Sequence, residues 1–257
     1  MLKLPDITIA ALACTHVYET VRALKYSMER VEFGGAVLVS HKKPFYLPKD
    51  IRFEHTSKNK SFDEFNYKVL YELHKYIHTD FVLLIHYDGF VINPDMWRGE
   101  FLNYDYIGAP WPHLKSLKDI HGNICRVGNG VSLRSKKLLE LPSKTGMPFE
   151  KVCNGTYNED LFICVNKRHV FEENGMKIAP LEIAKHFGHE AVIPEIKGIR
   201  PFVFHDYFGE NFKNKRFGRV WLKYIFMNKP FHILQRTFLK PFIKKIRKKY
   251  DVLAKYR

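Results

Sequence analysis

Three continuous apolar runs stand out in the first ninety residues. They are ITIAALAC at 7–14, GGAVLVS at 34–40 and FVLLI at 81–85, and all three consist mainly of small, aliphatic or aromatic residues. Short runs without polar alternation are typical of strands that are buried on both faces of a sheet. The pattern therefore predicts three central strands.

Between these runs, apolar residues recur at helical spacing. Residues 15–31 carry on one helical face Val17, Val21, Leu24, Met28 and Val31. Residues 62–77 carry in the same way Phe62, Phe65, Val69, Leu73 and Tyr76. The order of strand, helix and strand in the first 40 residues predicts a right-handed crossover between two parallel strands.

The pattern becomes less regular in the second half of the chain. Residues 127–141 predict a strand followed by a helix that ends at Pro142, and Gly175 is expected to cap a later helix. Residues 198–207 predict a late strand that ends in His205. Together these elements predict an α/β fold of the Rossmann type, with a mixed, mainly parallel central sheet.

Charge is distributed unevenly along the 257 residues, whose formal net charge is +15. Residues 213–257 hold 15 Lys or Arg and one acid, Asp251, so they account for +14 of that charge. We therefore expect a near-neutral α/β domain at residues 1–212 and a basic, amphipathic C-terminal segment at residues 213–257. This segment is expected to be helical in pieces.

The sequence favours a cytoplasmic protein. The apolar run at 7–14 is too short and too poorly flanked for a signal peptide, and no run reaches transmembrane length. The four cysteines form no CxxC pair, and we expect them to be reduced thiols.

A polar cluster follows the third apolar run, where His86, Tyr87 and Asp88 stand at the end of the predicted strand. In α/β folds, ligands bind beyond the carboxyl ends of parallel strands, which makes these residues candidates for a binding site. The alternative is a structural role, because Asp88-Gly89 is also a common turn signal.

A glycine-rich stretch, VGNGVSLRS at 127–135, is a second candidate. Gly128 and Gly130 would permit close approach of the backbone to a ligand, or they form a turn before a strand. Arg134 is expected to face a phosphate or the solvent. Trp111 suits either a sugar ring or the core.

Two further sites carry acids or a histidine. Asp160, in the NED stretch at 158–160, suits a general base, although Asn158 also suits a helix cap and acids suit a helix N-terminus. His205 suits a metal or phosphate contact, or a structural role, and the neighbouring Asp206 is placed to orient its ring or to act itself.

In their order and separation, these four sites resemble those of GT-A fold glycosyltransferases, in particular a bacterial family of poorly characterised members that act in surface-polysaccharide synthesis. The resemblance covers residues 6–207. It implies transfer of a sugar from a nucleotide-diphosphate donor to a hydroxyl of a glycan acceptor, with inversion. It also implies a divalent cation, Mn²⁺ or Mg²⁺, as cofactor.

The resemblance assigns roles to individual residues. His86 stands where such enzymes carry the first acid of Asp-x-Asp, and the metal ligands implied are Asp88, His86 and His205. Asp160 is implied as the catalytic base, with Glu159 second. The donor-binding residues implied are Thr15, His16, Tyr87, Asp88, Gly128, Asn129 and Gly130.

Residues 213–257 suggest a further partner. Basic residues interleaved with aromatic ones suit an anionic membrane surface, so we expect an enzyme bound peripherally to the inner face of the cytoplasmic membrane, with a lipid-linked acceptor. The alternative is that the aromatic residues of 217–239 cover the enzyme core.

Two other functions fit parts of the sequence. The basic segment by itself would suit a nucleic-acid-binding protein or a membrane-surface interaction protein. The near-neutral body shows no nucleic-acid motif, and we expect no nucleic-acid partner. A nucleotidyltransferase on a related fold would need a basic phosphate-binding fingerprint near residue 15, which the sequence lacks.

Overall fold

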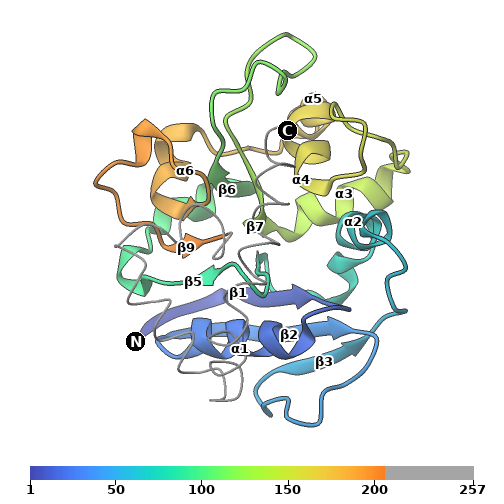
Figure 1. Ribbon diagram of the computed structural model, residues 1–257, viewed down its shortest axis with the longest axis vertical. Coiled ribbons are helices and arrows are strands. Elements are labelled where there is room, and N and C mark those ends of the chain that lie inside the picture. The colour runs from blue at the N-terminus through green and yellow to red at the C-terminus, as the bar shows by residue number, and fades with distance from the viewer. Residues whose placement is uncertain (206–257) are drawn as a thin grey trace, which may run out of the picture. The chain divides into compact units, whose positions relative to one another are not determined.

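The computed structural model describes residues 1–205, and the basic segment at 213–257 lies outside this described part of the chain. The centre of residues 1–205 is a six-stranded sheet with the strand order β3-β2-β1-β4-β7-β6 (Figure 1). The strands are β1 (Leu2–Leu12), β2 (Val31–Ser40), β3 (Arg52–His55), β4 (Phe81–Leu84), β6 (Tyr106–Pro110) and β7 (Val127–Ser135). In this sheet β7 runs opposite to the other five strands, so the predicted mainly parallel α/β fold is confirmed.

A second, three-stranded sheet has the order β5-β9-β8. Its strands are β5 (Phe90–Val91), β9 (Val203–Phe204) and β8 (Gly188–His189). β5 continues the chain just beyond β4 and pairs antiparallel with β9, whereas β8 pairs parallel with β9. The ends of β8 and β9 therefore lie side by side.

Helices connect the strands and cover the sheet. The α-helices are α1 (Val17–Met28), α2 (Phe62–Tyr71), α3 (Lys136–Thr145), α4 (Glu159–Leu161), α5 (Arg168–Glu173) and α6 (Leu181–Phe187). The 3-10 and π-helical turns are η1 (Leu73–Tyr76), η2 (Pro94–Met96), η3 (Gly99–Asn103), η4 (Phe162–Asn166) and η5 (Pro194–Ile196). Among residues 1–205, no helix is both long enough and apolar enough to cross a bilayer.

α2 and η1 pack against one face of the sheet through the apolar residues whose helical spacing the sequence showed at 62–77. Val69, Leu73 and Ile77 share a core cluster with residues of β1, β2 and β4. At the other end of α2, the Ser61 side chain accepts a hydrogen bond from the Glu64 amide at 3.2 Å, which satisfies one free donor of the first turn.

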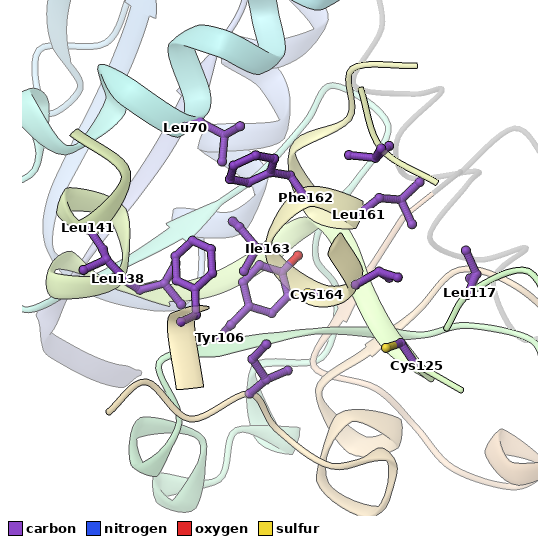
Figure 2. Packing of buried hydrophobic residues seen from close by; sticks show 14 of the residues in the cluster. Leu70, Tyr106, Leu117, Cys125, Leu138, Leu141, Leu161, Phe162, Ile163 and Cys164 are labelled. Carbon is purple, nitrogen blue, oxygen red and sulfur yellow. The ribbon is translucent and has the colours of Figure 1, made fainter. Parts of the chain in front are cut away.

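A second core cluster fixes the position of α4 and η4. Figure 2 shows Phe162 and Ile163 packed with Leu70, Tyr106 and Leu138, which come from α2, β6 and α3. η4 is a π-helical turn, closed by a 2.8 Å hydrogen bond from the Lys167 amide to the Phe162 carbonyl. Because the side chains after Asp160 are buried here, the start of α4 is held firmly against the sheet.

The structure departs from the predicted elements at several positions. β2 begins at Val31, so this residue belongs to a strand and not to the preceding helix. β3 was not predicted, because an edge strand with the sequence RFEH carries no apolar run. Pro142 lies inside α3, which ends at Thr145 because Gly146 adopts a left-handed φ of 63°.

The late strand is also shorter than its pattern suggested. Residues 198–207 contribute only Val203–Phe204 as β9. The expected helix end near Gly175 is confirmed, since this residue follows α5 with φ 78°.

Candidate functional site

The carboxyl ends of β1 and β4 meet at one edge of the sheet. Ala10 pairs with Leu84 in parallel register, so the residues that follow the two strands become neighbours. His16 has a left-handed backbone with φ 49°, and its ring stacks on Tyr87 with centroids 4.4 Å apart. Thr15 and His16 are exposed here, just beyond the carboxyl end of β1.

His86, Tyr87 and Asp88 form the tight turn that the Asp-Gly pair indicated. The His86 amide donates to the Gly89 carbonyl at 2.9 Å, and the Gly89 amide donates to the His86 carbonyl at 3.3 Å. A Cβ at Gly89 would lie 2.4 Å from Val131 Cγ2 and 2.6 Å from His205 Cδ2. Glycine is therefore required for this turn to pack against β7 and β9.

The turn brings Asp88 and His86 to His205. Phe90 of β5 pairs with Phe204 of β9, and this register places His205 opposite the turn. Ligand atoms of His86, Asp88 and His205 all lie within 4.8 Å of one another. Nε2 of His205 is 3.7 Å from Oδ1 of Asp88, and the two imidazole rings are 5.2 Å apart.

The chemistry of this cluster suits a divalent cation. Burial, with smaller contributions from His205 and Arg134, lowers the pKa of His86 to about 3, so its imidazole is neutral at physiological pH. Within the described residues, His86 Nε2 and Asp88 Oδ1 are buried without a hydrogen-bond partner. Neutral imidazole nitrogens with a carboxylate oxygen form a donor set that Mn²⁺-like ions accept.

The glycine-rich stretch lies within strand β7, so Gly128 and Gly130 do not form a turn before a strand. β7 is buried along its whole length. A Cβ at Gly128 would lie 2.0 Å from Trp111 Cη2, and one at Gly130 would lie 2.7 Å from His86 Cε1. The glycines thus let the strand pack against an indole and an imidazole, and Trp111 belongs to the core.

Asn129, between these glycines, connects three parts of the site. Its backbone adopts φ 107°, an unusual conformation for a residue with a side chain. Its backbone amide donates to Asp160 Oδ2 at 3.1 Å, and its side-chain Nδ2 donates to Glu190 Oε2 at 2.7 Å. Its Oδ1 accepts from the Val131 amide at 2.8 Å, so both ends of the side-chain amide have protein partners.

Asp160 lies in the first turn of α4. Asn158 caps this turn as predicted, accepting from the Leu161 amide at 3.3 Å. The same amide donates to Asp160 Oδ1 at 2.7 Å. Burial, followed by the charges of Glu159 and Glu190, raises the pKa of Asp160 from its ordinary value of 3.8 to about 7. Such a carboxyl group can accept a proton near neutral pH.

Glu159, the neighbour of Asp160 in the chain, forms an ion pair in the protein interior. Its carboxylate is buried, with Oε2 2.6 Å from a guanidinium nitrogen of Arg134. Arg134 also donates from Nε to Ser132 at 2.8 Å, and it lies over the Tyr106 ring at 5.1 Å. Arg134 therefore faces neither a phosphate nor the solvent, because its guanidinium forms an ion pair with the buried Glu159 carboxylate.

Glu190 is a site residue that the sequence pattern did not indicate. It follows β8, and its Oε1 lies 3.2 Å from Nδ1 of His205. Burial opposes ionisation of Glu190, but hydrogen bonds from His205 and Asn129 lower its pKa below the ordinary value. A two-residue strand carries no periodic signal, so only the pairing of β8 with β9 reveals this contact.

The predicted site residues thus fall into three groups. One continuous cluster contains His86, Asp88, Asn129, Gly130, Asp160 and His205, together with Glu190. His16 meets the cluster through Tyr87, and Thr15 precedes His16 in the chain. Gly128 and Glu159 support it from the buried side, and Asp206 lies outside the described residues.

Comparison with known proteins identifies one family and a set of solved structures. The sequence profile of one family, described as a protein of unknown function (DUF5672), matches residues 47–205. No curated protein matches the chain.

The chain is also similar to several solved structures. Glycosyltransferase GlyE of Streptococcus pneumoniae TIGR4, in its apo form, is 12% identical with a TM-score of 0.41, covering 85% of this chain and 60% of that chain. A glycosyltransferase involved in glycosylation of the major capsid of PBCV-1 is 14% identical with a TM-score of 0.48, covering 81% and 96%.

A third similar structure is the mannosyltransferase PcManGT of Pyrobaculum calidifontis, in complex with GDP-Man and Mn²⁺. It is 10% identical with a TM-score of 0.42, covering 70% of this chain and 57% of that chain. The chain thus spans less than two thirds of the pneumococcal and archaeal proteins. All three proteins are described as glycosyltransferases.

Proposed function

The chain belongs to the DUF5672 family of proteins of unknown function, and for this member we propose transfer of a sugar from a nucleotide-diphosphate donor to a hydroxyl of a glycan acceptor. One observation carries the proposal. At the carboxyl edge of the sheet, a cluster of two histidines and an acid lies beside a carboxyl group, Asp160, whose pKa is about 7. Asn129 and Glu190 connect the two by hydrogen bonds.

The histidine and aspartate cluster is the proposed diphosphate end of the donor site. His86, Asp88 and His205 would hold a divalent cation, Mn²⁺ or Mg²⁺, and this cation would balance the negative charge of the donor diphosphate. Thr15, His16 and Tyr87 are the proposed nucleotide contacts, and the stacking of His16 on Tyr87 beside the cluster supports this assignment. Gly130 keeps His86 in position, because any side chain there would collide with the imidazole.

Asp160 is the proposed general base. As the acceptor oxygen bonds to the anomeric carbon, its proton passes to a carboxylate oxygen of Asp160. The bond from that carbon to the donor phosphate breaks, and its electron pair leaves with the nucleotide diphosphate. Attack opposite the leaving group inverts the anomeric carbon. Glu159 supports this arrangement from its buried ion pair with Arg134.

The setting of the reaction is part of the proposal. Residues 213–257 carry most of the net positive charge, and such a segment is attracted to anionic headgroups. We therefore assign to the protein a lipid-linked glycan acceptor, at the inner face of the cytoplasmic membrane, in the synthesis of a cell-surface polysaccharide.

A ligand screen tests the proposal. The full chain is heated with UDP, GDP, CDP and dTDP sugars, each with Mn²⁺, with Mg²⁺ and with a chelator. We expect one nucleotide to raise the melting temperature, and a divalent cation to enlarge the shift. His86→Ala should remove the cation-dependent part, whereas His113→Ala, an exposed histidine outside the cluster, should keep it. A folded chain that responds to none of the donors would contradict the proposal.

A further inference from the structure

The connection between β2 and β3 presents an aromatic side chain to solvent. Its sequence is HKKPFYLPKD at residues 41–50, and it forms the blue loop at the lower right of Figure 1. Phe45 is 98% exposed, more than any other large hydrophobic residue in the described part of the chain. Isolated apolar residues on a surface are common, but a phenylalanine exposed almost completely is not.

Local contacts fix the conformation of this loop, while the Phe45 side chain stays exposed to solvent. Tyr46 packs edge-on against Tyr18 of α1 with centroids 5.0 Å apart, which ties the loop to the body of the domain. The Leu47 amide donates to the Pro44 carbonyl at 3.2 Å, closing a turn around Phe45 and Tyr46. Because a proline begins this turn, its backbone is restricted before any partner binds.

Three lysines flank Phe45 in the sequence. Lys42, Lys43 and Lys49 are exposed, and Asp50 is the one acid among residues 41–50. A protruding aromatic ring flanked by lysines matches a membrane interface, where the ring enters the acyl boundary and the ammonium groups remain at anionic headgroups. An acidic protein surface would satisfy the lysines but would need an apolar pocket for the ring as well, whereas an anionic bilayer offers both features.

We propose that residues 42–49 are a membrane-docking loop, in which Phe45 inserts into an anionic bilayer and Lys42, Lys43 and Lys49 contact its headgroups. The proposal uses no residue of the candidate site, and it does not depend on glycosyl transfer. It also concerns a different part of the chain from the basic segment at 213–257.

The loop leaves β2 at the same edge of the sheet that carries the candidate site. Tyr18, which anchors the loop, is two residues from His16, and His16 stacks on Tyr87. Docking through Phe45 would therefore place this edge close to the lipid surface, where a membrane-bound substrate can be reached.

An introduced indole tests whether residue 45 enters the bilayer. Phe45→Trp is made in the full chain and mixed with vesicles of phosphatidylglycerol and brominated phosphatidylcholine. Wild type sets the background of the native tryptophans. Ile120→Trp is the matched control, since Ile120 is 60% exposed and lies in the β6–β7 connection at the opposite end of the view in Figure 1.

We expect extra quenching and a blue shift for Phe45→Trp and neither for Ile120→Trp. If the chain binds vesicles but the indole at position 45 is no more quenched than the control, attachment occurs elsewhere and the proposal is wrong. If the indole responds to nucleotide sugars and not to lipid, the loop belongs to the donor site and the proposal is also wrong.

A second measurement compares affinities. Phe45→Ser should weaken the partition of the full chain into these vesicles about tenfold, as expected for loss of a buried aromatic ring. Ile120→Ser should leave it unchanged. Equal partition of Phe45→Ser and wild type would overturn the proposal, and because Phe45 is exposed, neither result can be attributed to unfolding.

Discussion

At the scale of single residues, Asp160 shows how the fold prepares a carboxyl group for proton transfer. The Asn129 and Leu161 amides donate to its two oxygens and favour ionisation, but burial and two neighbouring acids outweigh them. Because the folded-state pKa lies above the ordinary value, the protonated form stabilises the fold at low pH. That contribution is lost as the pH rises through about 7.

The pH dependence of transfer tests this residue. If Asp160 is the base, kcat/KM should rise with pH and level off above about 7, where the carboxylate predominates. Asp160→Asn should lower kcat by about 10²–10⁴-fold while leaving donor affinity nearly unchanged. A steady-state pH profile and a donor titration measure both, and unchanged turnover in Asp160→Asn would remove this residue from the mechanism.

The buried pair of Glu159 and Arg134 makes a separate prediction about stability. Glu159→Ala should reduce the free energy of unfolding by about 3–5 kcal/mol, because a buried guanidinium is left without its partner. Glu140→Ala, which removes an exposed pair with Lys144, should cost less than about 1 kcal/mol. Urea denaturation measures the free energy of unfolding of both variants. Equal decreases would show that burial does not make the Glu159–Arg134 pair more important for stability than the exposed pair.

At the scale of elements, β7 packs so closely against the site that it needs glycine. Gly130→Ala would place a methyl group 2.7 Å from His86 Cε1, so the imidazole must shift from Asp88 and His205. We expect a lower melting temperature and weaker Mn²⁺ binding by calorimetry. Gly99→Ala is the control, since a Cβ there meets nothing within 4 Å. Wild-type Mn²⁺ affinity in Gly130→Ala would show that His86 is not a ligand.

The parallel pairing of β8 and β9 predicts that Glu190 orients His205. Glu190→Gln should weaken Mn²⁺ binding about 10–100-fold, as expected when a carboxylate behind a ligating histidine is lost. It should also move the rise of kcat/KM to lower pH, because Glu190 helps to raise the pKa of Asp160. Glu195→Gln, which affects only a peripheral pair with Arg126, should change neither quantity.

At the scale of the whole molecule, charge separates a near-neutral domain from the basic segment at 213–257. The full chain should bind anionic vesicles with an affinity that falls as salt rises. Replacing Lys244, Lys245, Lys248 and Lys249 by Gln should weaken this binding more than about a hundredfold, at about 1 kcal/mol per charge near the surface. Cosedimentation measures both effects, and binding independent of salt and of these lysines would contradict this role.

The sequence by itself determined the features that depend on residues close together in the chain, namely the main strands, the turns and the helix caps. Continuous apolar runs located β1 and β4, because strands buried on both faces need apolar residues at every position. Local signals also located His86 and Asp88 in a turn and Asn158 as a cap. The mainly parallel sheet followed from the order of these elements.

Only the tertiary structure decided which distant residues touch. Arg134 and Glu159 form one buried pair although 25 positions separate them, and no local pattern could show that this arginine faces an acid. Glu190 reaches Asn129 and His205 only because two-residue strands pair in one register. Such contacts depend on how separate elements pack together. This packing leaves no periodic pattern in the sequence, so the sequence alone could not predict it.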